Sequence, residues 1–452
     1  MIVTLILSIL KFNIRLIDCI NHPKDLINRA IEIGLSGCSI TDHEALCSHM
    51  IVNKYAKEIK EKYPDFTIAL GNEIYLTDTR DKGQKYYHFI LLAKDRLGYK
   101  GLCELSSTAW YNVYVDRRLE RVPTLKSELK EIMKKYKGHI IATTACMGGE
   151  ISTNLYGLAL ARKTQDKEYE KLYYDKAVEF INFCIDVFGK EDFYIECAPS
   201  IKSDQVIVNK QLLNVAHAMG LKMVVGTDAH YLKKEDRYVH KSYLNSKQEE
   251  REVDDFYEYA YMQSPQEVRE HLSASMSDRD IDWIFENSLE VKNKIDFYSL
   301  EKHQHIPEVE VKDYPKQGYL EFFGGSFDGY NDQLDEFCNK YPILTDLFDS
   351  DNKQERYWVN QCFEALINRG IGLKEEYLDR LNEEARVKKV IGEKLETCMF
   401  AYPNTLQHYI DLFWRCGSTV GAGRGSACSG LNHYLLGVTQ LDPIEWNLPF
   451  WR

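Results

Sequence analysis

Short apolar runs alternate with amphipathic stretches through the first half of the chain. The stretches Asp25–Ile33 and Asp204–Met219 carry apolar residues at helical spacing, and each ends directly before a glycine. This alternation predicts parallel strands with helices packed outside them, and seven strand-like runs in about 230 residues suit a barrel better than an open sheet. After the apolar start of the chain, the expected strands are Gly37–Thr41, Phe66–Leu76, Tyr87–Ala93, His139–Ala145, Phe193–Cys197 and Lys222–Thr227.

The pattern changes after about residue 240. Gln248–Asp255 is a charged run that predicts a solvated helix face, and His303–Gly329 is rich in turn residues. Long charged or aromatic helices then dominate, expected at Asn352–Arg369, Glu375–Lys394, Asn404–Arg415 and Cys428–Leu436. We therefore expect an α/β domain over 1–275, a connecting segment over 276–350 and a partial, mainly helical domain over 351–452.

Composition narrows the class of protein. The chain has 452 residues, 44% of them hydrophobic, a net charge of −12 and twelve cysteines. The cysteines form no CxxC pair, which indicates reduced thiols and a cytoplasmic protein. No apolar run approaches the roughly 20 residues of a membrane span, and the apolar start lacks a basic region and a cleavage site, so we expect no membrane association and no signal peptide.

Polar side chains that bind metals recur where the expected strands begin or end. A single histidine there is usually a hydrogen-bonded core residue, and a single cysteine is usually a small buried apolar residue. Their ordered recurrence instead predicts a metal site, because strand ends of a βα barrel meet at one rim and carboxylates, imidazoles and thiolates bind divalent ions. The candidates are Asp42, His43, Glu73, His88, Cys146, Asp228 and His230.

A glycine loop with one arginine lies near the other end, at Gly421–Ala427. Such a loop alone is most often only a turn. Its glycines would nevertheless let backbone N–H groups approach a phosphate, and the planar, positively charged guanidinium of Arg424 would add further hydrogen-bond donors.

These motifs resemble, in order, those of the polymerase-and-histidinol-phosphatase (PHP) domain of the bacterial DNA polymerase III alpha family. The matching segments are 40–44, 71–73, 88–93, 145–150 and 226–231. The resemblance implies a distorted (βα)7 barrel that holds up to three divalent ions (Mg, Mn or Zn) and can act as a 3′–5′ exonuclease. The family's metal ligands fall on Asp18, His43, Glu73, His88, Cys146, Asp228 and His230, and Asp42 is expected to hold the turn at the strand end.

The glycine loop resembles the phosphate loop of the polymerase palm in the same family, with the likeness running from Gly421 to Pro443. It implies a DNA-directed DNA polymerase whose partners are DNA and deoxynucleoside triphosphates. The nucleotide would contact Gly423, Arg424, Gly425 and Ser426. Arg380 and Glu384 lie four residues apart on the expected preceding helix, so we expect them to pair with each other.

The sequence departs from the family in two places. The family's opening His-x-His is absent from Val3–Leu10, although one allowed codon choice there, read two bases later, encodes His-Thr-His-Thr-Glu-Tyr-Ser. We therefore expect either a frame slip or a native apolar strand with a weakened metal subsite. The family's catalytic aspartates follow the Asp-Pro element and are not in these residues, so this chain alone is not expected to extend a primer, and a second polypeptide could complete it.

Three functions remain open from the sequence. The first is the amino-terminal part of a replicative DNA polymerase. The second is a stand-alone PHP phosphoesterase, against which the palm-like loop counts. The third is a scaffold without metals, against which the retained ligands count. No residue is assigned a catalytic role beyond metal or nucleotide binding.

Overall fold

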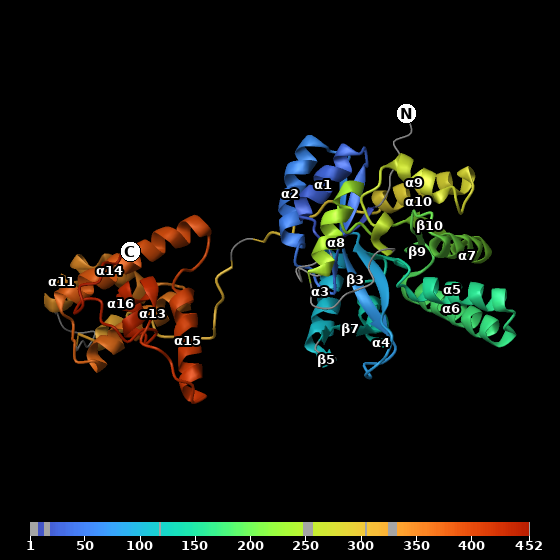
Figure 1. Cartoon of the computed structure of the whole chain (residues 1–452). Helices are drawn as coiled ribbons and strands as arrows, with labels where there is room; N and C mark the ends of the chain where they lie inside the picture. The colour runs from blue at the N-terminus through green and yellow to red at the C-terminus, as the bar shows by residue number, and fades with distance from the viewer. Residues whose placement is uncertain are drawn as a thin grey trace. The chain divides into compact units, whose positions relative to one another are not determined.

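The computed structural model describes residues 8–12, 19–116, 119–246, 256–302, 305–323 and 332–451 (Figure 1). The chain divides into two compact units, Met1–Glu301 and Lys302–Arg452. The expected helix face at Gln248–Asp255 and the candidate ligand Asp18 lie outside the described residues. Within these ranges, no helix is both long enough and apolar enough to cross a bilayer.

The first unit is built on one curled sheet whose neighbouring strands are ordered β1-β2-β3-β4-β8-β9-β10, with β7 added beside β3. The seven strands of this path correspond to the seven expected runs, whereas β7 was not expected, and β4 and β9 have the expected bounds. The strands of the sheet are β1 (Ser8–Phe12), β2 (Gly37–His43), β3 (Thr67–Thr77), β4 (Tyr87–Ala93), β7 (Pro123–Leu125), β8 (Ile140–Thr143), β9 (Phe193–Cys197) and β10 (Lys222–Val225). The α/β fold class is confirmed, and a separate hairpin pairs β5 (Tyr114–Asp116) with β6 (Leu119–Arg121).

One strand differs from the expectation of an all-parallel sheet. β4 runs antiparallel to both of its neighbours, β3 and β8. The connection from Thr77 to Tyr87 is too short to hold a crossover helix, so β3 and β4 form a hairpin. The reversal places the start of β4 beside the end of β3, and this decides where His88 lies.

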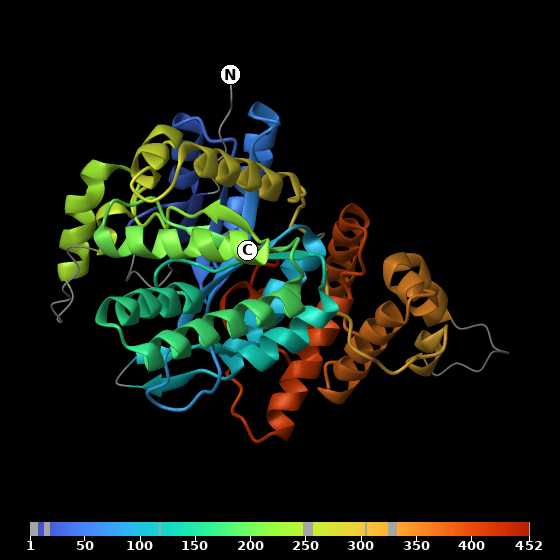
Figure 2. The same ribbon diagram turned by 90° about the vertical axis from the view of Figure 1, so that its right-hand side faces the viewer.

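Helices surround the sheet (Figures 1 and 2). The sequence patterns identified six of the ten but omitted α3, α5, α8 and α9. The helices of the first unit are α1 (Pro23–Glu32), α2 (His49–Lys62), α3 (Arg96–Tyr111), α4 (Lys126–Lys135), α5 (Glu150–Thr164), α6 (Lys167–Phe188), α7 (Ser203–Met219), α8 (Arg237–Asn245), α9 (Pro265–Leu272) and α10 (Asp278–Asn293).

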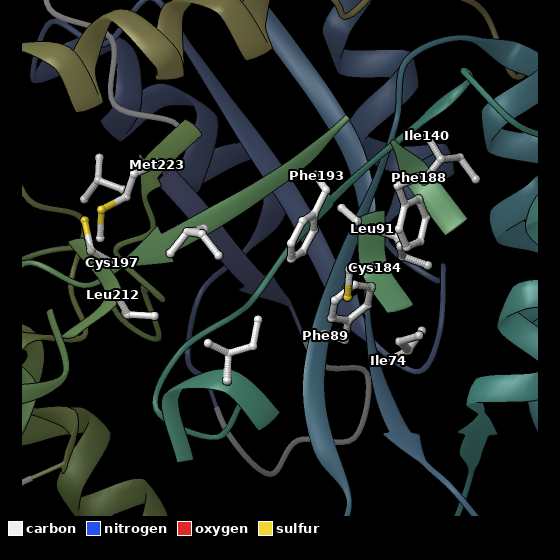
Figure 3. Close-up of a cluster of buried hydrophobic side chains, with 14 of the residues drawn as sticks. Ile74, Phe89, Leu91, Ile140, Cys184, Phe188, Phe193, Cys197, Leu212 and Met223 are labelled. Carbon is white, nitrogen blue, oxygen red and sulfur yellow. The ribbon is translucent and has the colours of Figure 1, made fainter. Parts of the chain in front are cut away.

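Both faces of the sheet are buried in apolar cores. Alternate residues of β4 point to opposite sides, so Phe89 and Leu91 join the larger cluster whereas Ile90 and Leu92 join a second one. In the larger cluster the Phe89 ring lies 5.8 Å from that of Phe180 on α6, and Figure 3 shows Phe89 among its neighbours. Burial on two faces explains why the strands read as continuous apolar runs rather than as alternating ones.

The two edges of the curled sheet approach each other just beyond β1 and β10. The Ile20 N–H donates to the carbonyl of His230 over 3.2 Å, and the Asn21 side chain donates to the carbonyl of Ala229 over 3.3 Å. These bonds join the segments that follow the two edge strands. They join the loop with Asp228 and His230 to the segment that leads into α1, as expected for a closing barrel.

The second unit is helical and has its own core. Its buried residues include Trp358, Phe363 and Phe400, and the Trp358 and Phe400 rings lie 4.9 Å apart. Where Cys428–Leu436 was expected to be one helix, a 3-10 turn at Gly425–Ser429 is separated from α16 by Gly430, whose backbone is extended. The α-helices are α11 (Asp332–Lys340), α12 (Pro342–Asp349), α13 (Lys353–Asn368), α14 (Glu375–Leu395), α15 (Ala401–Arg415) and α16 (Leu431–Leu435).

Candidate metal centre and phosphate loop

Three of the expected ligands gather in one group on the first unit. One donor atom each from Glu73, His88 and Cys146 lies within 4.8 Å of the others. The Glu73 carboxylate is 2.7 Å from Nδ1 of His88, and the Cys146 thiol is 3.6 Å from the same nitrogen. These residues come from β3, from the start of β4 and from the loop after β8, so the antiparallel direction of β4 is what brings them together.

His43 lies beside this group. It is paired with Glu73 in the β2–β3 register, and its Nδ1 is 3.9 Å from the Glu73 carboxylate. Glu73 itself lies inside β3 rather than at its end, because β3 extends to Thr77. The preceding residue, Asp42, accepts hydrogen bonds from the backbone N–H and the hydroxyl of Ser48, both at 2.8 Å. Asp42 therefore holds the turn after β2, as expected.

Asp228 and His230 lie on the loop after β10. Asp228 lines a cavity of about 350 Å³ together with Cys146. The His230 ring is buried against Tyr257 at 4.7 Å, and its Nδ1 lies 2.6 Å from the carbonyl of Asp228. If Nδ1–H donates to that carbonyl, Nε2 keeps the lone pair that a metal ligand needs. Within the described residues, neither side chain belongs to the compact group of three.

Burial and charge act together on His88. Burial by itself lowers the pKa of this imidazole, but the Glu73 carboxylate and Cys146 raise the pKa to about 10. A cation is therefore strongly favoured at this point between a carboxylate and a thiol. A carboxylate, an imidazole and a thiol are donors that divalent ions such as zinc use, so the residues present fit a divalent metal.

Two buried carboxylates near the rim were not among the predicted site residues. Glu44, directly after His43, accepts from the backbone N–H of Tyr75, and burial holds the pKa of its carboxyl well above the usual range. Glu196, in β9, accepts from the Thr143 hydroxyl. A side chain at Gly226 would collide with Glu196, since its Cβ would lie 2.0 Å from Oε1. An acidic residue inside an apolar run was the available signal for Glu196.

The glycine loop of the second unit is exposed from Gly421 to Ser426. Gly423 has a φ of 132°, and a Cβ there would lie 2.7 Å from the thiol of Cys428. The loop is closed by the Gln440 N–H, which donates to the carbonyl of Ala422 over 2.7 Å. Arg424 and Ser426 thus stand in solvent on a backbone whose shape requires glycine at position 423.

Two charged side chains of α14 support the residues that follow the loop. Glu384 is fully buried and accepts from the backbone N–H groups of Leu431 and Asn432 at 2.7 and 3.0 Å. Arg380 donates to the same carboxylate over 3.1 Å and to the carbonyl of Ser429 over 2.6 Å. The expected Arg380–Glu384 pair is therefore present, and it also fastens the backbone between the loop and α16.

Comparison with known proteins matches both units. The PHP domain family matches residues 11–200, and the family described as bacterial DNA polymerase III alpha NTPase domain matches residues 351–452. A DNA-directed DNA polymerase of Bacillus phage SPbeta is 36% identical over 98% of this chain and 34% of its own length. DNA polymerase III subunit alpha of Borreliella burgdorferi is 26% identical over 97% of this chain and 33% of its own.

A solved structure of an amidohydrolase from Chromobacterium violaceum covers 50% of this chain and 87% of its own, at 14% identity and a TM-score of 0.31. That likeness is too low to support an inference about function. The sequence matches are much more specific, and they agree with the rim of donors and the glycine loop.

Residues 11–200, which lie in the first unit with its curled α/β sheet and its rim of histidine, carboxylate and cysteine donors, are a PHP domain. The same chain continues into a bacterial DNA polymerase III alpha NTPase domain at residues 351–452, so it carries both domains in the order found in its polymerase relatives. It spans about a third of the length of the curated relatives it matches.

Proposed function

We propose that the PHP domain hydrolyses phosphodiester bonds at the 3′ end of DNA, within a replicative DNA polymerase whose nucleotide-binding loop is Gly421–Ala427. The observation that carries the hydrolytic part is the compact group of Glu73, His88 and Cys146. The polymerase part rests on the match of residues 351–452 and on the names of the relatives. DNA and deoxynucleoside triphosphates are the proposed substrates.

Glu73, His88 and Cys146 would hold a divalent ion. His43, which is 3.9 Å from Glu73, and Asp228, which lines the same cavity as Cys146, are the candidates for further coordination. A thiol among the donors favours Zn²⁺ over Mg²⁺ and Mn²⁺, which prefer oxygen ligands. A bound divalent ion supplies a more acidic water and stabilises negative charge on a phosphoryl oxygen. The cavity bordered by Cys146 and Asp228 would receive the substrate, and the Asp228 carbonyl would hold His230 in one orientation.

Metal content tests the site directly. We expect Cys146→Ser and Glu73→Gln each to lower the affinity for Zn²⁺ or Mn²⁺ at least about tenfold, since even groups that only orient ligands contribute that much. Elemental analysis and titration of the purified chain measure this change. Cys338→Ser, which alters a cysteine of the second unit, is the matched control. Equal metal content in all four proteins would contradict the site.

Hydrolysis is tested separately on 5′-labelled single-stranded DNA. Trimming from the 3′ end should depend on added Mn²⁺ or Zn²⁺ and should be lost in Glu73→Gln. Metal binding without any trimming would contradict the hydrolytic function while leaving the metal site intact.

The nucleotide loop has its own test. Gly423→Ala should weaken binding of a deoxynucleoside triphosphate, because the new methyl would meet Cys428 and Thr439 and disturb a backbone that L residues rarely adopt. Gly421→Ala is the control in the same loop, since nothing lies within 4 Å of its Cβ position. Protection of each variant against thermal unfolding by nucleotide measures the difference. Equal protection of both variants would argue against binding at this loop.

A stand-alone phosphoesterase is the less favoured function. A stand-alone phosphoesterase would use the same metal centre. This function would leave the segment 351–452, with its glycine loop, without a role. Retention of nucleotide binding by the second unit would therefore favour the polymerase proposal.

A further inference from the structure

Aromatic and basic side chains gather next to the metal centre. The end of α3 is held at this rim, because the Trp110 indole N–H donates over 2.7 Å to the carbonyl of Glu44, the residue that follows His43. The hairpin of β5 and β6 begins three residues after α3 ends. We name the group formed by Lys85, Tyr86, Tyr111, Tyr114 and Arg121 the rim ledge.

The ledge adjoins the ligand His88 along the chain. Tyr86 lies two residues before His88, directly before the start of β4. The Tyr86 hydroxyl bonds to that of Tyr114 on β5. Arg121, which is paired with Tyr114 across the hairpin, lies with its guanidinium 5.8 Å from the Tyr86 ring.

The ledge carries positive charge that carboxylates do not neutralise. Among the described residues, neither Arg121 nor Lys85 forms an ion pair with an acidic side chain. The Lys85 ammonium instead lies 5.0 Å from the Tyr87 ring and bonds to the Thr153 hydroxyl. Such cations stand out in a chain whose net charge is −12.

One ring of the ledge is open to solvent. Tyr111 is 89% exposed, whereas Tyr86 and Tyr114 are half-buried. A ring so exposed contributes little to folding, so packing does not explain its presence. Aromatic rings and cations on one surface are features that bind single-stranded nucleic acid: bases stack on the rings while phosphates approach the cations.

We infer that the rim ledge binds single-stranded DNA and leads its 3′ end to the metal centre. The inference rests on the proposed hydrolysis of DNA and adds the surface that selects the substrate. Lys85 and Arg121 would face phosphates, and Tyr111 and Tyr86 would stack on bases. Duplex DNA keeps its bases stacked on one another, so it would gain only the phosphate contacts and bind more weakly.

Fluorescence anisotropy with a labelled oligo(dT) of about 20 nucleotides tests the ledge on the full chain, at about 50 mM salt and with a chelator present. Tyr111→Ser should weaken binding about tenfold, as expected for loss of one stacked base. Lys85→Gln and Arg121→Gln should each reduce the slope of log affinity against log salt by about 0.7. The matched controls are Tyr174→Ser, at an exposed tyrosine of α6, and Lys137→Gln.

Because the chelator removes any metal, this binding does not depend on hydrolysis. Hydrolysis of bis(p-nitrophenyl) phosphate with Mn²⁺ reports on the metal centre without the ledge, and it should be unchanged in the ledge variants. Loss of affinity in the ledge variants but not in the controls supports the inference. Equal affinity of ledge variants, controls and the unaltered chain overturns it, as does equal affinity for duplex and single strands. Absence of hydrolysis alone counts only against the proposed function.

Discussion

At the scale of single residues, part of the backbone strain lies at the metal centre. Of the seven non-glycine residues with left-handed backbones in the described part of the chain, three are there: Glu44 with a φ of 51°, Ala145 with 58° and Asp228 with 47°. Each such conformation costs about 1 kcal/mol relative to an ordinary one. Glu44 follows His43 and Ala145 precedes Cys146, whereas Asp228 is itself a candidate ligand. At these three positions the chain turns sharply and directs donor atoms to the rim.

A single carboxylate has a comparable role in the second unit. Glu384 accepts from two backbone N–H groups, from the Asn432 side chain at 2.6 Å and from Arg380. A buried carboxylate without these donors would be very unfavourable, and the donors without the carboxylate would lose their partner. The residues after the phosphate loop thus depend on one side chain from a distant part of the sequence.

We predict that Glu384→Gln lowers the free energy of unfolding of the second unit by about 2–4 kcal/mol, because an amide cannot accept all four donors. Urea or thermal unfolding measures this. Glu383→Gln is the control on the adjacent residue: its ion pair with Arg386 is roughly half exposed, so the change should stay within about 0.5 kcal/mol. Equal effects of the two substitutions would contradict the role of Glu384.

At the scale of elements, α10 is fastened to the sheet by a charged network. Glu290 on α10 accepts from Tyr194 of β9 at 3.0 Å and from Lys222 of β10 at 2.9 Å, and it pairs with Lys294. Asn287, one turn earlier, donates to the carbonyl of Met223 over 3.0 Å. Burial alone raises the pKa of Glu290. The hydrogen bonds that Glu290 accepts from Lys222, Lys294 and Tyr194 outweigh burial and lower this pKa to about 2.

This lowered pKa predicts an acid dependence of stability. A carboxyl with a folded pKa near 2 and an unfolded value of 4.5 stabilises the fold above about pH 4.5, and the contribution disappears as the pH falls toward 2. We expect Glu290→Gln to cost about 1 kcal/mol at neutral pH, a value reduced for screening at a side chain that is 34% exposed. Unfolding at pH 7, 4 and 2.5 should show the difference between the two proteins shrinking. A difference independent of pH would show that packing, rather than charge, is lost.

At the scale of the whole molecule, the buried apolar clusters of the two units share no residue among those the structure describes: the clusters on the sheet lie within 1–301, and that of the helical unit lies within 302–452. The candidate metal centre belongs to the first unit and the phosphate loop to the second. A ligand stabilises the part of a protein that binds it, by about 2.7 kcal/mol at a hundred times its dissociation constant.

We therefore predict two unfolding transitions in calorimetry. Zn²⁺ or Mn²⁺ should raise the midpoint of one, and a deoxynucleoside triphosphate should raise the midpoint of the other. His43→Ala should abolish or reduce only the metal effect, and Gly423→Ala only the nucleotide effect. One transition that responds equally to both ligands would show that the two units unfold as one.

The local pattern of the sequence determined most elements and the types of residue at the site. β4 and β9 have the bounds that their apolar runs predicted, and the glycine after α7 ends that helix as expected. Local patterns succeed here because strand period and helix termination depend on neighbouring residues. Helix α5 was missed because it buries Ile151, Asn154 and Leu155, and so lacks the single apolar stripe that marks a surface helix.

Only the tertiary structure decided the direction of β4, and with it the meeting of His88 with Glu73 and Cys146. A strand buried on both faces has the same sequence pattern whether it runs parallel or antiparallel, so its direction depends on the connection and on its partners. The contacts of Glu384 with residues 47 and 48 positions further along the chain depend in the same way on long-range packing. The sequence by itself thus determined which donors and which loop this protein has. The fold decided which of them lie together, because contacts between distant residues form only when the cores around them pack.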